Sequence, residues 1–350
     1  MSISSNFSAG RISWLWFALA CLVLLIAPAL FDVNTMTVLL IWALFALSLG
    51  LMWGYAGILS FGHAAYFGLG AYTFAVASMN IGESTLPLLL AMLIPALLAA
   101  VIGAMMFYGR ISDVYMGVIT LVVSLIMFKF INSTAGDAYR IGDARLGGFN
   151  GIPAFPVLNV PGDPELQIYG LGLYYVVAVA LLICYLLCRW ILSSWFGRVL
   201  VGIRENEARI ELLGYSAPLY KTAIFTVSAA MAGLAGSLFA TWAEIVTPGL
   251  FSLGQSAEVI IYTIVGGLGT LVGPMLGAIG LGFLKLLLGE QTVVDNSLLL
   301  GVILVLVVLL LPSGIVPSFV RWRQRRAQAA AARNKASSTR RRRRHHGEGT

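Results

Sequence analysis

The sequence contains little charge and few of the residues that carry out enzyme chemistry. Only 11% of its 350 residues are charged, and it has three cysteines and three histidines. It contains no phosphate-binding loop ending in G-K-[ST], no G-x-S-x-G nucleophile motif and no H-E-x-x-H zinc motif. These absences argue against catalysis and against nucleotide binding by this chain, and we expect it to hold no cofactor.

The few metal-binding residue types are also poorly placed for a metal site. Cys184 and Cys188 lie in one apolar stretch with no histidine nearby, so we interpret them as packing residues. His345 and His346 form a lone adjacent pair, which is a weak signal for metal. We therefore predict no metal site.

Long apolar runs are what the sequence has in abundance. Hydrophobic residues make up 59% of the chain, and the mean hydropathy is +0.90. The core of a soluble protein could not bury this many apolar side chains. We predict an all-α polytopic membrane protein with about 8–10 transmembrane helices, some Gly-rich and partly broken or re-entrant. The candidate spans are 13–31, 36–56, 58–79, 87–108, 114–132, 169–192, 221–243, 255–269, 273–289 and 297–316.

The positions of Lys and Arg predict which side of the membrane each connection faces. The connection 193–220 contains Arg198, Arg204 and Arg209, so we expect it in the cytoplasm together with the Arg-rich C-terminus. Counting spans backwards places the segment 133–168 outside and the N-terminus inside. That external segment is too polar for lipid and rich in Gly and Pro, which predicts a structured loop.

The chain divides by composition into a membrane domain, residues 1–320, and a basic tail, residues 321–350. The tail holds eleven of the 22 Lys and Arg residues, whereas 14 of the 15 acidic residues precede it. A block of like charge is predicted to be disordered. We interpret it as a cytoplasmic topology determinant, and binding to anionic lipid headgroups is the alternative.

Glycines are numerous, with 38 in the chain. Lipid offers no hydrophobic drive for helices to associate, so close backbone approach at small residues must supply the packing. Several glycines recur at a spacing of three or four residues within the candidate spans. The predicted packing glycines are Gly50, Gly54, Gly233, Gly236, Gly273 and Gly277.

One charged stretch, "RENEARIELLG" from Arg204 to Gly214, interrupts the apolar chain. Helical spacing puts Glu207 and Glu211 one turn apart, and Gly214 is placed to end the helix. A short amphipathic helix between two spans either lies on the membrane or docks a cytosolic partner. A membrane-surface helix needs a basic polar face, and this one is Glu-rich, which favours a protein partner.

Four ordered motifs in the sequence resemble those of one family. They are "GIRENEARIELLGYSAPLYKTAIFTVSAAMAGLAGSLFA" from Gly202, "GYAGILSFGHAAYFGLGAY" from Gly54, "GGLGTLVGPMLGA" from Gly266 and "LGGFNGI" from Leu146. Together they resemble the permease subunits of branched-chain amino acid ABC importers over roughly residues 36–316. Leu146 departs from the Thr of the family pattern.

The resemblance implies a non-enzymatic transport subunit of the bacterial inner membrane. Its expected partners are cytoplasmic ATP-binding subunits that hold ATP and Mg²⁺, a second permease that is paralogous to this chain, and a periplasmic or lipoprotein substrate-binding protein. Nucleic acid is not an expected partner. The charged stretch is then the element that couples to the ATPase, and its predicted residues are Arg204, Glu205, Asn206, Glu207, Ala208, Glu211 and Gly214.

Polar and glycine residues inside the spans are candidates for the translocation pathway, because a charge in lipid costs several kcal/mol and marks a pathway or a pair. Glu258 is expected either to line the route or to bond a neighbouring helix, and His63 either to bond a helix or to contact substrate. Lys129 and Lys285 are expected to extend toward the membrane surface. The predicted pathway residues are His63, Glu258, Gly266, Gly267 and Gly269.

Two alternatives stay open at this point. A permease for urea or short-chain amides has closely similar motifs, and "LGGFNGI" does not distinguish it from an amino acid permease. A non-transporting membrane scaffold with a lipid-binding tail is the second alternative. A copurifying ATP-binding protein would separate the transporter from the scaffold.

Overall fold

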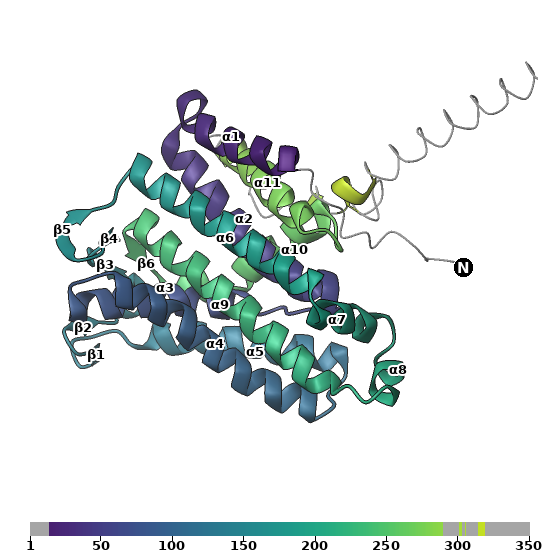
Figure 1. The fold of residues 1–350 in the computed structure, drawn as a ribbon. Helices are drawn as coiled ribbons and strands as arrows, with labels where there is room; N and C mark the ends of the chain where they lie inside the picture. The colour runs from purple at the N-terminus through teal and green to yellow at the C-terminus, as the bar shows by residue number, and fades with distance from the viewer. Residues whose placement is uncertain (1–13, 290–300, 303–304, 306–313, 319–350) are drawn as a thin grey trace, which may run out of the picture.

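The computed structural model describes residues 14–289, 301–302, 305 and 314–318, and this part of the chain is a helical bundle with short strands at one end (Figure 1). The predicted span 297–316 falls largely outside these residues, and the basic tail 321–350 does so entirely. The predicted all-α polytopic fold is confirmed. Within the described residues, five helices are long and apolar enough to cross a membrane: α2 (Val33–Ala56), α4 (Thr85–Tyr108), α5 (Asp113–Ser133), α6 (Leu171–Ser193) and α9 (Ala217–Ala243).

Four further apolar helices lie beside these five, and two more helices lie at one end of the bundle. The apolar helices are α1 (Trp14–Leu30), α3 (Ala64–Ile81), α10 (Leu253–Gly266) and α11 (Val272–Gly289), and the end helices are α7 (Trp195–Glu205) and α8 (Glu207–Leu212).

The predicted start of one span is wrong. We expected a helix over 58–79, whereas α3 begins at Ala64 and residues 57–63 form no regular helix. The reason is tertiary, because the Phe61 N–H donates to Thr120 Oγ1 of α5 at 3.2 Å instead of closing a helical turn. A Cβ at Gly62 would overlap the Thr120 carbonyl, so this backbone can approach α5 only through glycine.

Helix α2 has clear start and stop signals. Asp32 caps its first turn by accepting the Thr35 N–H at 2.8 Å, and this hydrogen bond lowers the pKa of the Asp32 carboxyl. Gly57 ends it in the left-handed conformation with φ of 76°, and the Gly57 N–H donates to the Trp53 carbonyl. The chain therefore leaves α2 sharply and enters the irregular residues 57–63.

Helices α2 and α9 form the centre of the bundle, with α3 and α4 packed against α9. A Cβ at Gly70 of α3 would overlap the backbone of Gly233 in α9, and a Cβ at Gly233 would overlap the Ala91 carbonyl of α4. Gly236 faces the carbonyl of Phe67 in the same way. These small residues let the backbones of α3 and α9 touch, which is how helices associate in lipid.

Short strands tie down the loop between α5 and α6 at the end of the bundle opposite α7 and α8 (Figure 1). Asn80 at the end of α3 holds this loop through the Ile141 carbonyl and the Asp143 N–H. The three antiparallel pairs in the described chain are β1 (Arg140–Ile141) with β2 (Ala144–Arg145), β3 (Ile152–Pro153) with β6 (Ile245–Val246), and β4 (Asn159–Val160) with β5 (Asp163–Gln167). The loop predicted over 133–168 is thus structured, and we call this end of the bundle the loop end.

Candidate functional site

We predicted that the charged stretch from Arg204 to Gly214 forms one helix. The structure instead divides it into the end of α7 and the short helix α8. Asn206 breaks the helix in an extended conformation, with φ of −161° and ψ of 98°. Its side-chain Oδ1 accepts the Arg209 N–H at 3.0 Å and so caps α8. Asn competes for backbone hydrogen bonds in this way, which explains why an apparently continuous helical pattern divides here.

Gly214 has the conformation that helix ends favour. It follows α8 with φ of 88°, and its N–H donates to the Glu211 carbonyl at 2.9 Å. L-residues with a side chain resist this left-handed region. Gly214 therefore turns the chain from α8 into α9.

Several predicted residues of this stretch hold α7 and α8 onto the bundle. Glu207 Oε2 lies 2.5 Å from Lys221 Nζ of α9, and Glu211 Oε2 lies 3.8 Å from Arg110 Nη2 at the end of α4. Arg204 donates from Nη1 to the carbonyl of Gly54 in α2. The charges of these side chains therefore face the protein as much as the solvent.

An apolar contact fixes α8 against α7 as well. The Ile210 side chain lies against Gly202, and it joins a small hydrophobic cluster with Val199, Ile203 and Ala217. Figure 1 shows α7 and α8 projecting beyond the ends of the long helices. The segment 195–214, which we call the α7–α8 segment, is a braced projection at this end of the bundle.

Two leucines at the tip of the α7–α8 segment were missed by the sequence reasoning. The relative exposure of Leu212 is 89% and that of Leu213 is 67%. Glu205 and Ala208 of the same segment are also exposed, whereas Glu207 and Glu211 are partly covered. Two adjacent leucines inside a charged stretch were the available signal, because apolar side chains held away from the bundle favour an interaction surface.

A second feature lies where two helices begin inside the bundle. The Ala64 N–H at the start of α3 donates to Ser256 Oγ, in the first turn of α10, at 3.3 Å. Each helix follows an irregular segment that contains no α-helix: residues 57–63 before α3, and residues 247–252, which include a short 3-10 helix, before α10. The N-termini of α3 and α10 therefore meet inside the bundle, where Ala64 and Ser256 are both fully buried.

His63, at the start of α3, is buried in this centre. Its Nε2 lies 2.8 Å from Ser48 Oγ of α2, and Ser48 Oγ donates to the Phe45 carbonyl. Since the one hydroxyl hydrogen is used there, the geometry assigns a hydrogen to His63 Nε2. Within the described residues, His63 Nδ1 has no hydrogen-bond partner.

Helix α5 contacts both irregular segments. Thr120 accepts the Phe61 N–H, and four residues further Ser124 Oγ donates to the Phe251 carbonyl at 2.8 Å. Phe251 belongs to the 3-10 helix η2 (Pro248–Phe251), and the Phe251 ring also lies against Gly68 of α3. One face of α5 therefore touches the chain before α3 and the chain before α10.

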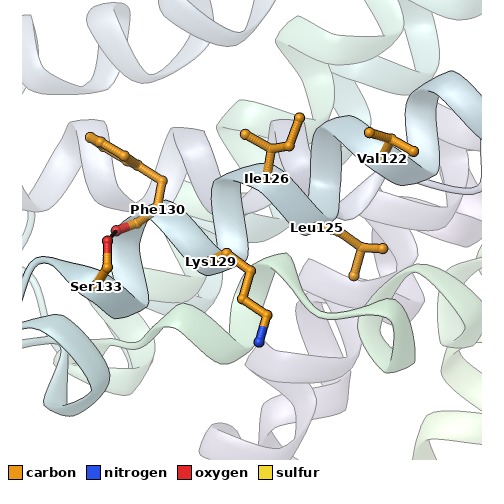
Figure 2. Close-up of a pocket in the computed structure, with 6 residues that line it drawn as sticks. All are labelled: Val122, Leu125, Ile126, Lys129, Phe130 and Ser133. Atoms are coloured by element: carbon orange, nitrogen blue, oxygen red, sulfur yellow. Dashed lines mark hydrogen bonds between the residues drawn. The ribbon is translucent and has the colours of Figure 1, made fainter.

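The opposite face of α5 carries an open apolar groove with one charged group (Figure 2). Figure 2 shows Ile126 and Phe130 on one side of the helix, and Leu125 and Lys129 on the other. Lys129 was expected to extend toward the membrane surface, and here it also borders this groove. Its lining residues are Val122, Leu125, Ile126, Lys129, Phe130 and Ser133.

Glu258 of α10 forms an ion pair rather than standing alone. Its Oε1 lies 2.5 Å from Lys285 Nζ of α11, and the Tyr262 hydroxyl donates to its Oε2 at 3.4 Å. We had expected Lys285 to extend toward the membrane surface, and in the structure its ammonium pairs with the Glu258 carboxylate. The pair joins α10 to α11.

The other predicted pathway residues, Gly266, Gly267 and Gly269, form the turn between α10 and α11. Gly267 and Gly269 have φ of 109° and 81°, and Gly266 packs on the backbone of Gly273. This turn lies near the α7–α8 segment, far from the meeting point of α3 and α10.

The predicted packing glycines lie at close contacts. Gly50 faces the Pro274 ring and Gly54 faces the backbone of Gly269, so α2 packs on the α10–α11 hairpin. Gly277 faces the Tyr262 carbonyl within that hairpin.

The described residues contain no group of three or more His, Cys, Asp or Glu side chains suited to a metal. Cys184 and Cys188 are buried in α6, where Cys188 Sγ lies 3.7 Å from Met231 Sδ. Both cysteines thus pack in the core.

Comparison with known proteins gives a consistent result. Residues 32–311 match the family described as the permease component of the branched-chain amino acid transport system. The chain is 28% identical to the high-affinity branched-chain amino acid transport permease LivM of Escherichia coli K12, over 82% of this chain and 69% of that protein. It is 24% identical to a probable LivM of Methanocaldococcus jannaschii and 25% identical to BraD of Pseudomonas aeruginosa, in each case over 94% of the relative. No solved structure matches.

Proposed function

The chain belongs to the permease family of branched-chain amino acid transport systems, and we propose that it moves branched-chain or other hydrophobic amino acids by alternating access. The proposal places it in the inner membrane of a bacterium, with both termini in the cytoplasm. Its α7–α8 segment then faces the cytoplasm, and the loop end faces outward.

In this proposal ATP and Mg²⁺ bind to separate cytoplasmic subunits. Two of these dock at the α7–α8 segments of this chain and of a second, paralogous permease. A soluble or lipid-anchored binding protein delivers substrate to the loop end. This division of labour fits a chain whose sequence contains no phosphate-binding loop.

The observation that carries the docking proposal is the exposure of Leu212 and Leu213 on a braced segment. A membrane-surface helix would need basic residues beside its apolar ones. Here the three glutamates that precede the leucines, Glu205, Glu207 and Glu211, outnumber the two arginines of the stretch, so anionic lipid is a poor partner. A protein cleft that receives two leucines fits this arrangement better.

Copurification tests the docking proposal. Each leucine contributes about 2 kcal/mol if it is buried in an interface, so Leu212→Ser together with Leu213→Ser should reduce capture of the ATP-binding subunit. Leu166→Ser is the matched control, because Leu166 is an exposed leucine at the loop end. Capture at the control level by the double variant would contradict docking at this tip.

The α5 groove favours amino acids over urea as the substrate class. A branched-chain amino acid has an apolar side chain and a carboxylate, and the groove offers apolar residues with the Lys129 ammonium among them. Urea is neutral and polar and matches neither feature. We therefore assign the translocation route to this face of α5, with the second permease opposite it.

His63, Glu258, Gly266, Gly267 and Gly269 are proposed to act behind this route. The irregular segments that contact α5 contain or adjoin His63, and α10 carries Glu258. A shift of α3 or α10 would therefore move α5. Bistable packed elements of this kind are how small displacements become alternating access.

A further inference from the structure

Arg204, one of the residues predicted for the ATPase contact, reaches from α7 to the membrane domain. It lies in the last turn of α7, and its Nη1 donates to the Gly54 carbonyl near the end of α2. The aliphatic part of its side chain lies against Gly57, where a Cβ would come within 3.3 Å of Arg204 Cγ. The guanidinium thus sits at the carboxyl end of α2.

The end of a helix is a suitable place for this cation. The last four carbonyls of a helix lack intrahelical partners, and the helix dipole places negative charge there. Gly54 is within this last turn of α2, which ends at Ala56. Arg204 therefore supplies both a hydrogen bond and a charge that the end of α2 lacks.

The same position brings Arg204 to the α10–α11 turn. Gly54 lies against the backbone of Gly269, and a Cβ at Gly269 would be 3.9 Å from Arg204 Nη1. The turn follows α10, and at the other end of α10 Ser256 Oγ accepts the Ala64 N–H at the start of α3. One side chain from the α7–α8 segment thus lies where α2 meets the two helices of the α10–α11 hairpin.

We infer that Arg204 is the positioning residue that transmits movement of the α7–α8 segment to α2 and the α10–α11 turn, rather than a contact for the ATP-binding subunit. The inference rests on the proposed function. The partner subunit would dock at Leu212 and Leu213, and its displacement of the segment would reach the membrane domain through this guanidinium. Removing the Arg204 side chain should then uncouple movement of the α7–α8 segment from movement of the membrane domain, without preventing docking of the ATP-binding subunit.

A labelling experiment in the assembled transporter measures that transmission directly. Val272→Cys places a thiol at the exposed start of α11, next to the turn, and Cys21→Ser removes the native cysteine that is not buried. The rate of thiol modification at position 272 is compared with and without ATP and vanadate. In the parent the rate should change when nucleotide is trapped.

Arg204→Ala should abolish this nucleotide-dependent change while the ATP-binding subunit still copurifies at the parent stoichiometry. Substrate transported per ATP hydrolysed should fall at least about fivefold, the lower range of typical coupling between sites. Arg204→Lys keeps a cation at the end of α2. It should restore part of the labelling change at position 272 and part of the substrate transported per ATP hydrolysed. Arg198→Ala is the matched control on α7, because Arg198 contacts Ser193 at the end of α6 and the Trp195 ring of α7, and neither residue belongs to α2 or to the α10–α11 turn.

Two results would overturn the inference. A normal labelling change at position 272 in Arg204→Ala would show that movement reaches the turn by another path. Loss of the ATP-binding subunit from Arg204→Ala but not from Arg198→Ala would show that Arg204 is itself a docking contact. Failure of the proposed function would look different, because the parent protein would then capture no ATP-binding subunit.

Discussion

At the scale of single residues, two glutamates that the sequence analysis assigned to the ATPase contact, Glu207 and Glu211, form ion pairs within this chain. Glu207 with Lys221 is one such pair. Glu207→Lys would place two cations together and release α8 from α9. Because Glu207 is partly exposed, the pair contributes only about 1 kcal/mol, and we expect a partial loss of substrate-stimulated ATP hydrolysis.

The exchange of both charges separates an internal role from docking. If Glu207 serves to hold α8, Glu207→Lys with Lys221→Glu should recover most of the ATPase stimulation that the single change loses. Failure of the exchanged pair to recover, at normal subunit stoichiometry, would mean that Glu207 itself contacts the ATP-binding subunit.

The Glu258 and Lys285 pair makes a second prediction at this scale. Removing one partner of a buried ion pair is costly, about 3–5 kcal/mol, whereas replacing both by apolar residues is often neutral. The two side chains keep some exposure here, so the lower part of that range applies. Lys285→Met should lower the midpoint of thermal unfolding in detergent more than Lys285→Met combined with Glu258→Leu, and equal midpoints would contradict a structural pair.

Lys129 is the residue on which the substrate assignment depends. If its ammonium binds the substrate carboxylate, Lys129→Gln should raise the KM for leucine uptake about tenfold, since a charge-assisted bond is lost. Lys129→Arg should remain near the parent value. An unchanged KM in Lys129→Gln would remove the α5 groove from the route.

At the scale of elements, close backbone contact between α3 and α9 should tolerate no added side-chain atom. A Cβ at Gly236 would overlap the Phe67 carbonyl, whereas a Cβ at Gly280 meets no atom within 4 Å. Gly236→Ala should therefore reduce the yield of folded protein, and Gly280→Ala should not. Equal yields of monodisperse protein from the two variants would show that α3 and α9 can separate without cost.

Most helices could be predicted from the sequence, because a membrane span requires a long run of apolar residues. The predicted ends of α1, α2, α4, α5, α6 and α9 lie within four residues of the structure. The start of α3 could not be found in this way, since residues 57–63 contain the apolar residues Ile58, Leu59 and Phe61 and so continue the apolar pattern of the predicted span. What breaks them is the contact of Phe61 and Gly62 with Thr120, which no local pattern contains.

The candidate site shows the same limit. The residue types in the stretch from Arg204 to Gly214 identified it, and the left-handed Gly214 follows from its position after α8. The directions of its side chains did not follow, because they depend on Gly54, Arg110 and Lys221 from three other helices. The exposure of Leu212 and Leu213 did not follow either, because an apolar residue type alone does not show which way its side chain faces.

At the scale of the whole molecule, the loop end and the α7–α8 segment lie at opposite ends of the bundle (Figure 1). In intact cells, an impermeant thiol reagent should label a cysteine at position 166 and leave one at position 212 unlabelled. Both positions are exposed in the structure, so burial would not explain a difference. Labelling of position 212 from outside would reverse the proposed orientation.

Uptake by the reconstituted transporter tests the central claim most directly. Proteoliposomes containing this chain, its paralogous permease and the ATP-binding subunits are supplied with the binding protein and with labelled leucine or urea. We predict leucine uptake that requires ATP and is lost in the Leu212→Ser and Leu213→Ser double variant. Uptake of urea without leucine, or leucine uptake that persists without ATP, would contradict the account.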